Sequence, residues 1–324
     1  MAGLSHLLER ATSREPMKTA DSKSAATFER VVIDGDTYVL KVVDGTSDWL
    51  SIASRDVEGR AVCLWEDGVY AQMPASIDHT VVAAARLHPT SAWPAALLMH
   101  DATDALVPED APVTSSTHDA FLGAMADVAV AFRHEQPRTT YMPLVVNYVA
   151  FSPGEARRQE EQGTWGGPQP FVVSGWERIR VDVPELYADV APLLDEPGPL
   201  VTALQAMPMT FLHGDWKMGN LGHRPDGRVV LLDWDRPCVG PPLVDLGWYI
   251  AVNCDRLPES KDDTLARYRD ALERRGWDTR GWWERQVTLA LTGAFAQMGW
   301  SKAGQSEELA WWQPHVRAAR QLLG

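Results

Sequence analysis

The feature that most constrains this chain is a polar loop set between two apolar runs at residues 211–247. The polar residues of the loop are, in order, His213, Gly214, Asp215, Lys217 and Asn220. Residues 221–232 then have the pattern of a β-hairpin with a turn at 225–227, and Asp233 follows the second apolar run. Because a hairpin returns the chain to the edge from which it left, we expect Asp233 to lie beside Asn220.

The residue types in this loop suit phosphoryl transfer. Asn220 and Asp233 offer hard oxygen ligands of the kind that Mg²⁺ prefers, so both are candidate metal ligands. Asp215 is then free to orient a hydroxyl nucleophile and accept its proton, and Lys217 can reach the transferred phosphoryl group. A metal-dependent hydrolase is an alternative interpretation, and it would use His213, Asp215, His223 and Asp233.

Two short segments carry a family resemblance. His-Gly-Asp-Trp-Lys-Met-Gly-Asn at 213–220 resembles the catalytic loop of the aminoglycoside phosphotransferase and choline kinase superfamily. Leu-Leu-Asp-Trp-Asp at 231–235 resembles the metal-binding segment of that superfamily. The resemblance implies an α+β, protein-kinase-like fold of two lobes and an ATP- and Mg²⁺-dependent phosphotransferase. It also implies that Asp215 and Lys217 are the catalytic residues.

The rest of the chain divides near residue 100. Strand patterns cover residues 28–33, 37–43, 78–87 and 94–99, and a helical pattern covers residues 47–70. After residue 100 the patterns are mainly helical, and Ser152 followed by Pro153 and Glu155 is typical of a helix start. We therefore expect a small antiparallel N-lobe at 1–100, with one helix, that binds nucleotide. A larger, mainly helical C-lobe at 101–324 would supply the hinge, the acceptor-binding helices and the catalytic loop.

Lys41 lies in the middle of an apolar strand pattern, where an ammonium without a partner is costly. The resemblance implies that this lysine contacts the α- and β-phosphates of the nucleotide. It also implies a carboxylate partner on the following helix. Glu58 is the first candidate for that partner, and Asp56 and Glu66 are the alternatives.

Two further segments are candidate nucleotide contacts by the same resemblance. The loop at 19–27 lies where phosphates would be cradled, and it contains Lys23 and Ser24 but no glycine. The strand at 94–99 would lead into the hinge that binds the adenine edge. Met99, His100 and Asp101 are the candidate residues there.

Other polar residues near the loop have supporting interpretations. Asp245 matches a structural aspartate of the superfamily and should brace the catalytic loop, as should His213. Asp235 could approach the metal or only end its strand. His223 and Cys238 are interpreted as structural.

The charge is unevenly distributed. The formal net charge of −14 disfavours a nucleic-acid partner or an anionic membrane surface, which both need a basic footprint. Residues 101–200 carry 6 Lys and Arg against 16 Asp and Glu, whereas residues 201–324 carry 15 of each. The acidic stretch is either a solvated helical surface or a wall that attracts a cationic ligand.

We expect the acceptor to be a small-molecule hydroxyl on an amino sugar or an aminoglycoside-like antibiotic. A metabolic kinase of the glucosamine, choline or homoserine type and a nucleotide-binding, pseudokinase-like module without turnover are alternatives. The polar residues 160–171 could form a lid, and the tryptophans of the last fifty residues could stack on a sugar or fill the core.

The remaining sequence features favour a cytoplasmic protein. The three cysteines form no Cys-x-x-Cys pair, which is typical of a reducing compartment. The N-terminus has charges every few residues and no apolar signal core. No apolar run approaches the roughly 18 residues of a membrane span.

Overall fold

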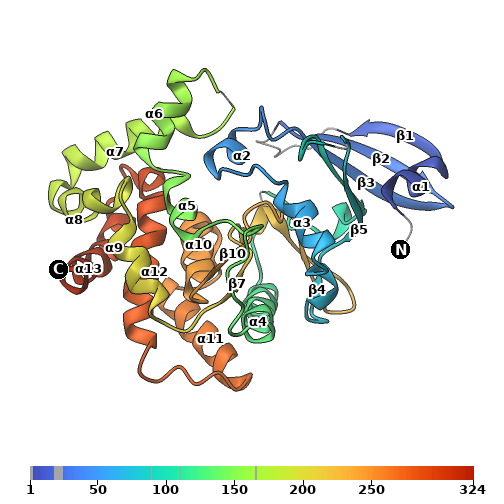
Figure 1. Cartoon of the computed structure of the whole chain (residues 1–324). Helices are drawn as coiled ribbons and strands as arrows, with labels where there is room; N and C mark the ends of the chain where they lie inside the picture. The colour runs from blue at the N-terminus through green and yellow to red at the C-terminus, as the bar shows by residue number, and fades with distance from the viewer. Residues whose placement is uncertain (1–2, 18–24, 89, 110, 165) are drawn as a thin grey trace.

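Five antiparallel strands form the N-terminal sheet of the computed structural model, in the order β1-β2-β3-β6-β5 (Figure 1). They are β1 (Ala11–Met17), β2 (Thr27–Ile33), β3 (Asp36–Val43), β5 (Val81–Arg86) and β6 (Ala95–His100). The structure describes residues 3–17, 25–88, 90–109, 111–164 and 166–324. The predicted turn between β2 and β3 is present, with Asp34 and Gly35 both at positive φ, as a tight hairpin turn requires.

One face of the sheet is covered by a short helix that the sequence patterns did not predict. Helix α1 (Leu4–Glu9) places Leu4 against Val31, Leu40 and Leu98, which are all buried. Strand β1 was also not predicted, because it is an edge strand whose side chains are mostly exposed and polar.

The single helix predicted at 47–70 is wrong, since the segment forms two short helices. Helix α2 (Trp49–Ala53) and helix α3 (Arg60–Glu66) are separated at Arg55 and Gly59, which both have positive φ. The Asp56 carboxylate then accepts the N–H groups of Gly59 and Arg60 at the start of α3. These hydrogen bonds fix the start of α3, whereas α2 ends where Arg55, directly after its C-cap Ser54, takes a positive φ.

The C-terminal part is built from helices around one large core. These are α4 (Ser115–Ala131), α5 (Leu144–Val149), α6 (Pro153–Glu161), α7 (Gln169–Asp182), α8 (Pro184–Leu194), α9 (Gly198–Gln205), α10 (Leu243–Val252), α11 (Lys261–Arg274), α12 (Trp283–Met298) and α13 (Ser306–Leu323). Ser152 caps α6 as predicted, by accepting the N–H of Glu155. The α+β prediction is therefore confirmed. Among the described residues, no helix is long and apolar enough to cross a membrane.

The tryptophans of the C-terminal segment mainly fill this core. Trp277, Trp283 and Trp312 are buried, and Trp312 packs on Phe295. The predicted loop at 160–171 is shorter than expected, because α7 begins at Gln169 after Pro168.

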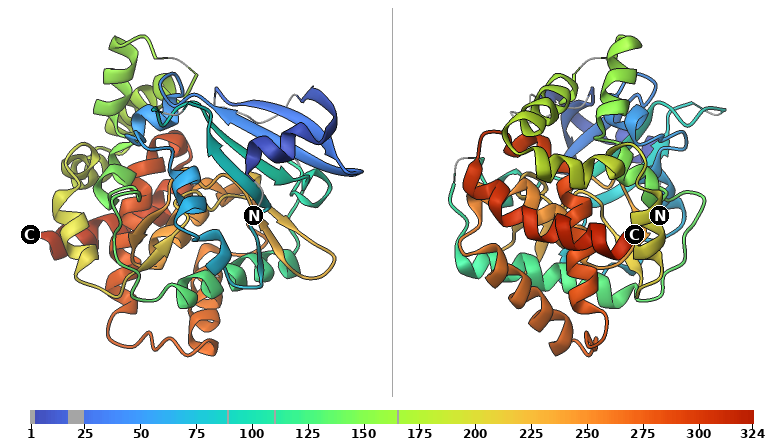
Figure 2. Two further views of the ribbon diagram at one scale, coloured as in Figure 1. Left: turned by 45° about the vertical axis from the view of Figure 1, so that its right-hand side comes forward. Right: turned by 90° about the vertical axis from the view of Figure 1, so that its left-hand side faces the viewer.

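A small hairpin sheet lies under the N-terminal sheet and joins the two parts of the chain. Strands β8 (Leu221–His223) and β9 (Val229–Leu231) are antiparallel, and β4 (Ile77–Asp78) pairs with β9 in parallel. The hairpin is the yellow-orange loop below the sheet in the left view of Figure 2. The strand predicted at 78–87 is thus interrupted at Thr80, where φ is +59°, so that β4 leaves the sheet that β5 joins.

The other edge of the hairpin contacts the segment that follows β6. The Val107 N–H donates to the Leu221 carbonyl, and Leu106 forms a bridge with Gly222. A Cβ at Gly222 would lie 2.5 Å from the Ala105 carbonyl oxygen and 3.1 Å from the Leu106 Cα. Both are main-chain atoms, so the backbones must separate to accept a larger residue.

We predict that Gly222→Ala lowers the free energy of unfolding by about 1–3 kcal/mol, because the added methyl overpacks two backbones. Gly198→Ala at the exposed start of α9 is the matched control, since nothing lies near its Cβ position. It should change stability by less than about 0.5 kcal/mol. Urea unfolding measures both, and equal effects would contradict the close approach at Gly222.

Candidate active site

Asp215 lies in the loop that follows β7 (Thr210–Leu212), and its carboxylate is held by several neighbouring side chains. Its Oδ1 accepts the indole N–H of Trp248 at 3.0 Å, and its Oδ2 accepts from Asn220 Nδ2 at 2.9 Å. The Lys217 Nζ lies 2.9 Å from the same Oδ2. Burial alone would raise the pKa of Asp215, but Lys217 and Arg236 lower it below its ordinary value. The carboxylate is therefore ionised at neutral pH and held in one orientation.

The backbone of the loop is fixed by a second buried carboxylate. Asp245, in the first turn of α10, accepts the N–H groups of His213 at 2.8 Å and Gly214 at 2.9 Å. Gly214 has a φ of +80°, and a Cβ there would strike the Arg236 carbonyl. Burial raises the pKa of Asp245 to about 6 despite these two hydrogen bonds. Asp245 thus braces the loop, as expected.

His213 also braces the loop. The imidazole is fully buried, and its Nδ1 accepts the N–H of Asp215 at 3.2 Å. Burial lowers the pKa of His213 to about 4, so the ring is neutral. Its ring also packs edge-on against Trp234.

The hairpin brings the predicted metal ligands to one place. The Leu232 N–H donates to the Asn220 carbonyl at 2.9 Å, so Asp233 follows directly beside Asn220. Asp233 has a φ of +61°, a conformation that a non-glycine residue adopts only where its surroundings hold it. The predicted juxtaposition of Asn220 and Asp233 is therefore present.

Lys41 reaches the hairpin from β3. Its Nζ lies 2.7 Å from Asp233 Oδ1 and 2.8 Å from Asp235 Oδ2. Burial alone would lower the pKa of Lys41, but the two carboxylates raise it well above its ordinary value. Lys41 and Lys217 in turn lower the pKa of Asp233 to about 2 against the opposing effect of its burial. Lys41, Asp233 and Asp235 thus form one charged cluster between the two parts of the molecule.

The structure does not bring the predicted helix carboxylate to Lys41. Glu58 is exposed on the segment before α3, Asp56 caps α3, and Glu66 forms an ion pair with Arg86. The pairing of Glu58 with Lys41 is thus corrected: Glu58 faces solvent, and the Lys41 ammonium pairs with Asp233 and Asp235 instead.

The other candidate nucleotide contacts lie either near the end of β6 or outside the described residues. Met99 is partly buried against the core at the end of β6, and His100 stacks on Tyr38 at 5.2 Å between ring centroids. The N–H groups of His100 and Asp101 donate to the Thr80 and Thr37 carbonyls. The Asp101 carboxylate accepts from Thr103 and Arg30. Lys23 and Ser24 lie outside the described residues.

Two residues of the site were not predicted. Arg236 is 1% exposed, lies over the rings of Phe151 and Trp248, and has its guanidinium 3.9 Å from Asp215. Trp248 donates to Asp215 from α10. In the sequence, Arg236 directly follows the Leu-Leu-Asp-Trp-Asp segment, and Trp248 follows Asp245 by one helical turn. Neither residue type alone identifies a site residue.

More than half of the acids in the stretch at 101–200 are paired with arginines. At least nine of its sixteen acids pair with arginines: Asp101, Asp119, Asp127, Glu135, Glu155, Glu177, Asp182, Glu185 and Asp189. Several of these arginines come from the last third of the chain, whose own charges balance. Five of the nine pairs use arginines from outside the stretch, so about half of its net charge of −10 is offset on the helical surface.

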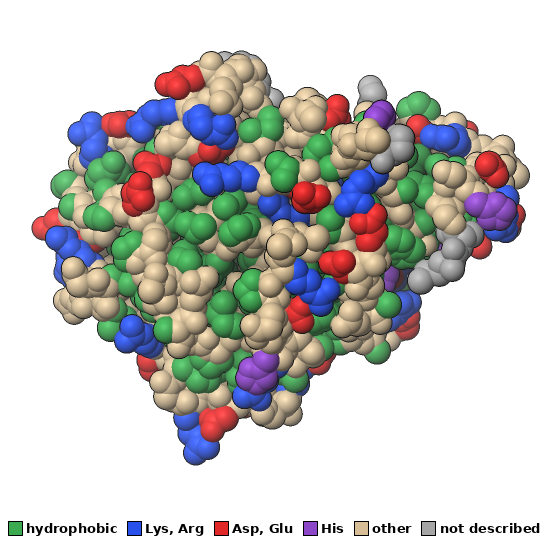
Figure 3. Space-filling model, in the orientation of Figure 1, with side chains coloured by type: hydrophobic (Ala, Val, Ile, Leu, Met, Phe, Trp, Pro, Cys, Tyr) green, Lys and Arg blue, Asp and Glu red, His purple; other side chains and the backbone are tan. Residues whose placement is uncertain are grey.

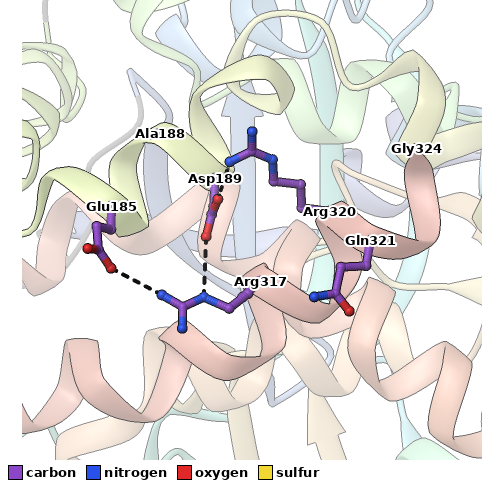
Figure 4. Close-up of a pocket in the computed structure, with 7 residues that line it drawn as sticks. All are labelled: Glu185, Ala188, Asp189, Arg317, Arg320, Gln321 and Gly324. Atoms are coloured by element: carbon purple, nitrogen blue, oxygen red, sulfur yellow. Dashed lines mark hydrogen bonds and ion pairs between the residues drawn. The ribbon is translucent and has the colours of Figure 1, made fainter.

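A surface hollow between α8 and α13 lies apart from the loop and the hairpin (Figure 4). Its charged side chains point toward one another, with Arg317 paired to Glu185 and Asp189, and Arg320 paired to Asp189. Because these charges satisfy each other, we assign no chemistry to this hollow.

His223 does not support a hydrolase site. It is exposed on β8, whereas His213 is buried and bonded to the loop backbone. Within the described residues, no group of three or more His, Cys, Asp or Glu side chains has the arrangement of a metal site.

We predict that Asp245→Ala lowers the free energy of unfolding by about 2–4 kcal/mol, because two buried N–H groups lose their acceptor. Asp226→Ala in the exposed β8–β9 turn is the control and should have an effect below about 0.5 kcal/mol. Chemical unfolding followed by tryptophan fluorescence measures both. A near-neutral Asp245→Ala variant would contradict the bracing role.

Comparison with solved structures places the fold among aminoglycoside phosphotransferases. APH(3'')-Id from Streptomyces rimosus is 18% identical over 88% of this chain and 93% of that chain, with a TM-score of 0.51. Spectinomycin phosphotransferase APH(9)-Ia, solved with ADP and spectinomycin, is 11% identical over 97% and 88%, with a TM-score of 0.51. A thermostable APH(4)-Ia variant, solved with ADP and hygromycin B, is 12% identical over 98% and 96%, with a TM-score of 0.50.

Comparison with curated proteins gave no match. A family model described as the phosphotransferase enzyme family matches residues 23–283, which include most of the N-terminal sheet, the loop after β7 and the hairpin. The chain belongs to the phosphotransferase enzyme family.

Proposed function

We propose that this protein is a Mg-ATP-dependent kinase that transfers the γ-phosphoryl group to a hydroxyl of a small molecule. The observation that carries the proposal is the convergence of Asp215, Asn220 and Asp233 on one loop and hairpin, with Lys41 reaching them from β3. Two of the solved structures named above hold ADP together with hygromycin B or spectinomycin, which supports this class of reaction.

Asp215 would orient the acceptor hydroxyl. Phosphoryl transfer proceeds through a loose transition state, so a carboxylate that positions the nucleophile contributes more than a strong base would. Trp248 and Asn220 hold one oxygen each, and the nearby Lys217 is more exposed than Asp215. Lys217 can therefore turn from Asp215 to the transferred phosphoryl group while Asp215 keeps its orientation.

The residues around the hairpin fit a magnesium ion. Asp233 and Asp235 already converge on a single cation, the Lys41 ammonium, and their side chains are 43% and 31% exposed. The Asn220 side chain adds an amide of the kind that Mg²⁺ accepts as a ligand. Asn220 and Asp233 would hold the ion, which would neutralise the phosphates when bound.

The surface around α5, α6 and α7 supports a proposal for the chemical class of the acceptor. Hydrophobic side chains gather around α5 on the face shown in Figure 3, and Val145 of α5 and Phe171 of α7 are exposed. Exposed acids at Glu160 and Glu161 lie at the end of α6. This combination supports an amino sugar or aminoglycoside-like acceptor, with an apolar face and amino groups.

We predict that Asp215→Asn lowers kcat by about 10²–10⁴-fold, because the amide cannot accept the hydroxyl proton. Affinity for Mg-ATP should change by less than about threefold, since Asp215 does not contact the nucleotide in this proposal. Steady-state kinetics and calorimetry measure the two effects. An equal loss of nucleotide binding would contradict the assigned role, and Asp226→Ala controls for general damage.

We predict that Asp233→Ala weakens binding of the Mg-nucleotide by about tenfold or more, because a charged metal ligand is lost. Raising the Mg²⁺ concentration should recover part of the activity of Asp233→Ala and none of that of Asp215→Asn. Magnesium titrations of the transfer rate test this difference. Identical titration curves for the two variants would contradict the separate roles.

The direct test of function is a mass-shift screen for phosphate addition with Mg-ATP. Acceptors would include aminoglycosides, amino sugars, choline and homoserine, with neutral sugars as the control. Phosphate addition to one class identifies the acceptor. ATP binding without addition to any acceptor would overturn the kinase proposal in favour of a module without turnover.

A further inference from the structure

We propose that Asp235 is the positioning residue that holds Lys41 toward the nucleotide phosphates, in place of a carboxylate on the helix after β3. The inference rests on the proposed function, since it assigns a role within the same site. Asp235 follows β9 by four residues and lies 194 residues from Lys41 in the sequence. The sequence resemblance assigns no such role to this position.

The buried position of Lys41 requires that its positive charge always be paired with a carboxylate. The side chain is only 6% exposed, so water does not compensate its charge. A buried ammonium that loses its partner is strongly unfavourable. The Nζ is held by two carboxylates, Asp233 at 2.7 Å and Asp235 at 2.8 Å.

The buried face of helix α3 carries no carboxylate. Its buried residues are Arg60, Ala61, Val62, Cys63 and Leu64. The acids around it are engaged elsewhere or face solvent: Asp56 caps the helix, Glu66 pairs with Arg86, and Glu58 is exposed.

The buried face of α3 carries a cation instead. The Arg60 guanidinium donates to the Ser54 and Arg55 carbonyls and to the Ser54 hydroxyl. The helix thus carries a cation where a carboxylate was expected, and the carboxylates that meet Lys41 come from the segment after β9.

The two carboxylates on Lys41 have different tasks when a nucleotide binds. Asp233 is the proposed metal ligand, so Lys41 held by Asp233 alone would compete with Mg²⁺ for the same oxygens. Asp235 gives Lys41 a second anchor that does not depend on the metal. Lys41 therefore stays near the hairpin while Asp233 turns to the ion.

A double-mutant cycle tests this assignment, because a residue that acts through Lys41 has no effect once Lys41 is removed. Calorimetry would measure the affinity of Mg–AMP-PNP for the wild-type protein, Asp235→Asn, Lys41→Ala and the double variant. We expect Asp235→Asn to weaken binding about tenfold in the wild-type background and less than about twofold in the Lys41→Ala background. Equal losses in both backgrounds would overturn the proposal, since Asp235 would then act on the metal or the fold directly.

Glu58→Gln and Glu66→Gln are the matched controls, and both should keep the affinity within about twofold. A loss at Glu58→Gln as large as that at Asp235→Asn would overturn the proposal in favour of the helix carboxylate. Thermal unfolding checks each variant, and Asp235→Ser takes the place of Asp235→Asn if the latter does not fold. Asp235→Glu keeps the charge and should recover most of the affinity. A wild-type protein that binds no Mg–AMP-PNP would overturn the proposed function itself, which distinguishes that failure from the failure of this assignment.

Discussion

The burial of charge is the constraint on which the arrangement of this site depends. Lys41, Asp215, Arg236 and Asp245 are each at most 5% exposed. A charge removed from water must be met by an opposite charge or by hydrogen bonds. Here every one of the four is met by a group from a different segment of the chain. Displacement of any one segment would leave a buried charge without its partner, so the loop, the hairpin, α10 and β3 hold one another in place.

The parts of the fold that could be predicted are those determined by residues close in sequence. The turn at Asp34 and Gly35, the cap at Ser152 and the 221–231 hairpin each depend on a few neighbouring side chains. The division of residues 47–70 into two helices could not be predicted in this way, because polarity patterns do not record the positive φ of Arg55. Strand β1 gave no signal, since an exposed edge strand has no apolar alternation.

Prediction of the candidate site from the sequence is limited in the same way, to residues that are close in the chain. Asn220 and Asp233 could be placed together because one hairpin carries both. The partner of Lys41 could not be found from the sequence, because Asp235 is brought to it only by tertiary contacts. The partners of many acids in the stretch at 101–200 could not be found from the sequence either. Arginines such as Arg267, Arg275 and Arg317 reach this stretch from the last third of the chain.

The small hairpin is attached on both sides to segments that leave the N-terminal sheet. Strand β4 pairs with β9, and Leu106 and Val107 follow β6 and pair with β8. The hairpin is thus tied through both edges to segments of the N-terminal part. Lys41 of β3 is joined to the residues after the same hairpin by its ion pairs with Asp233 and Asp235. Any movement that separated the sheet from the hairpin would therefore have to break these two ion pairs as well as the edge pairings.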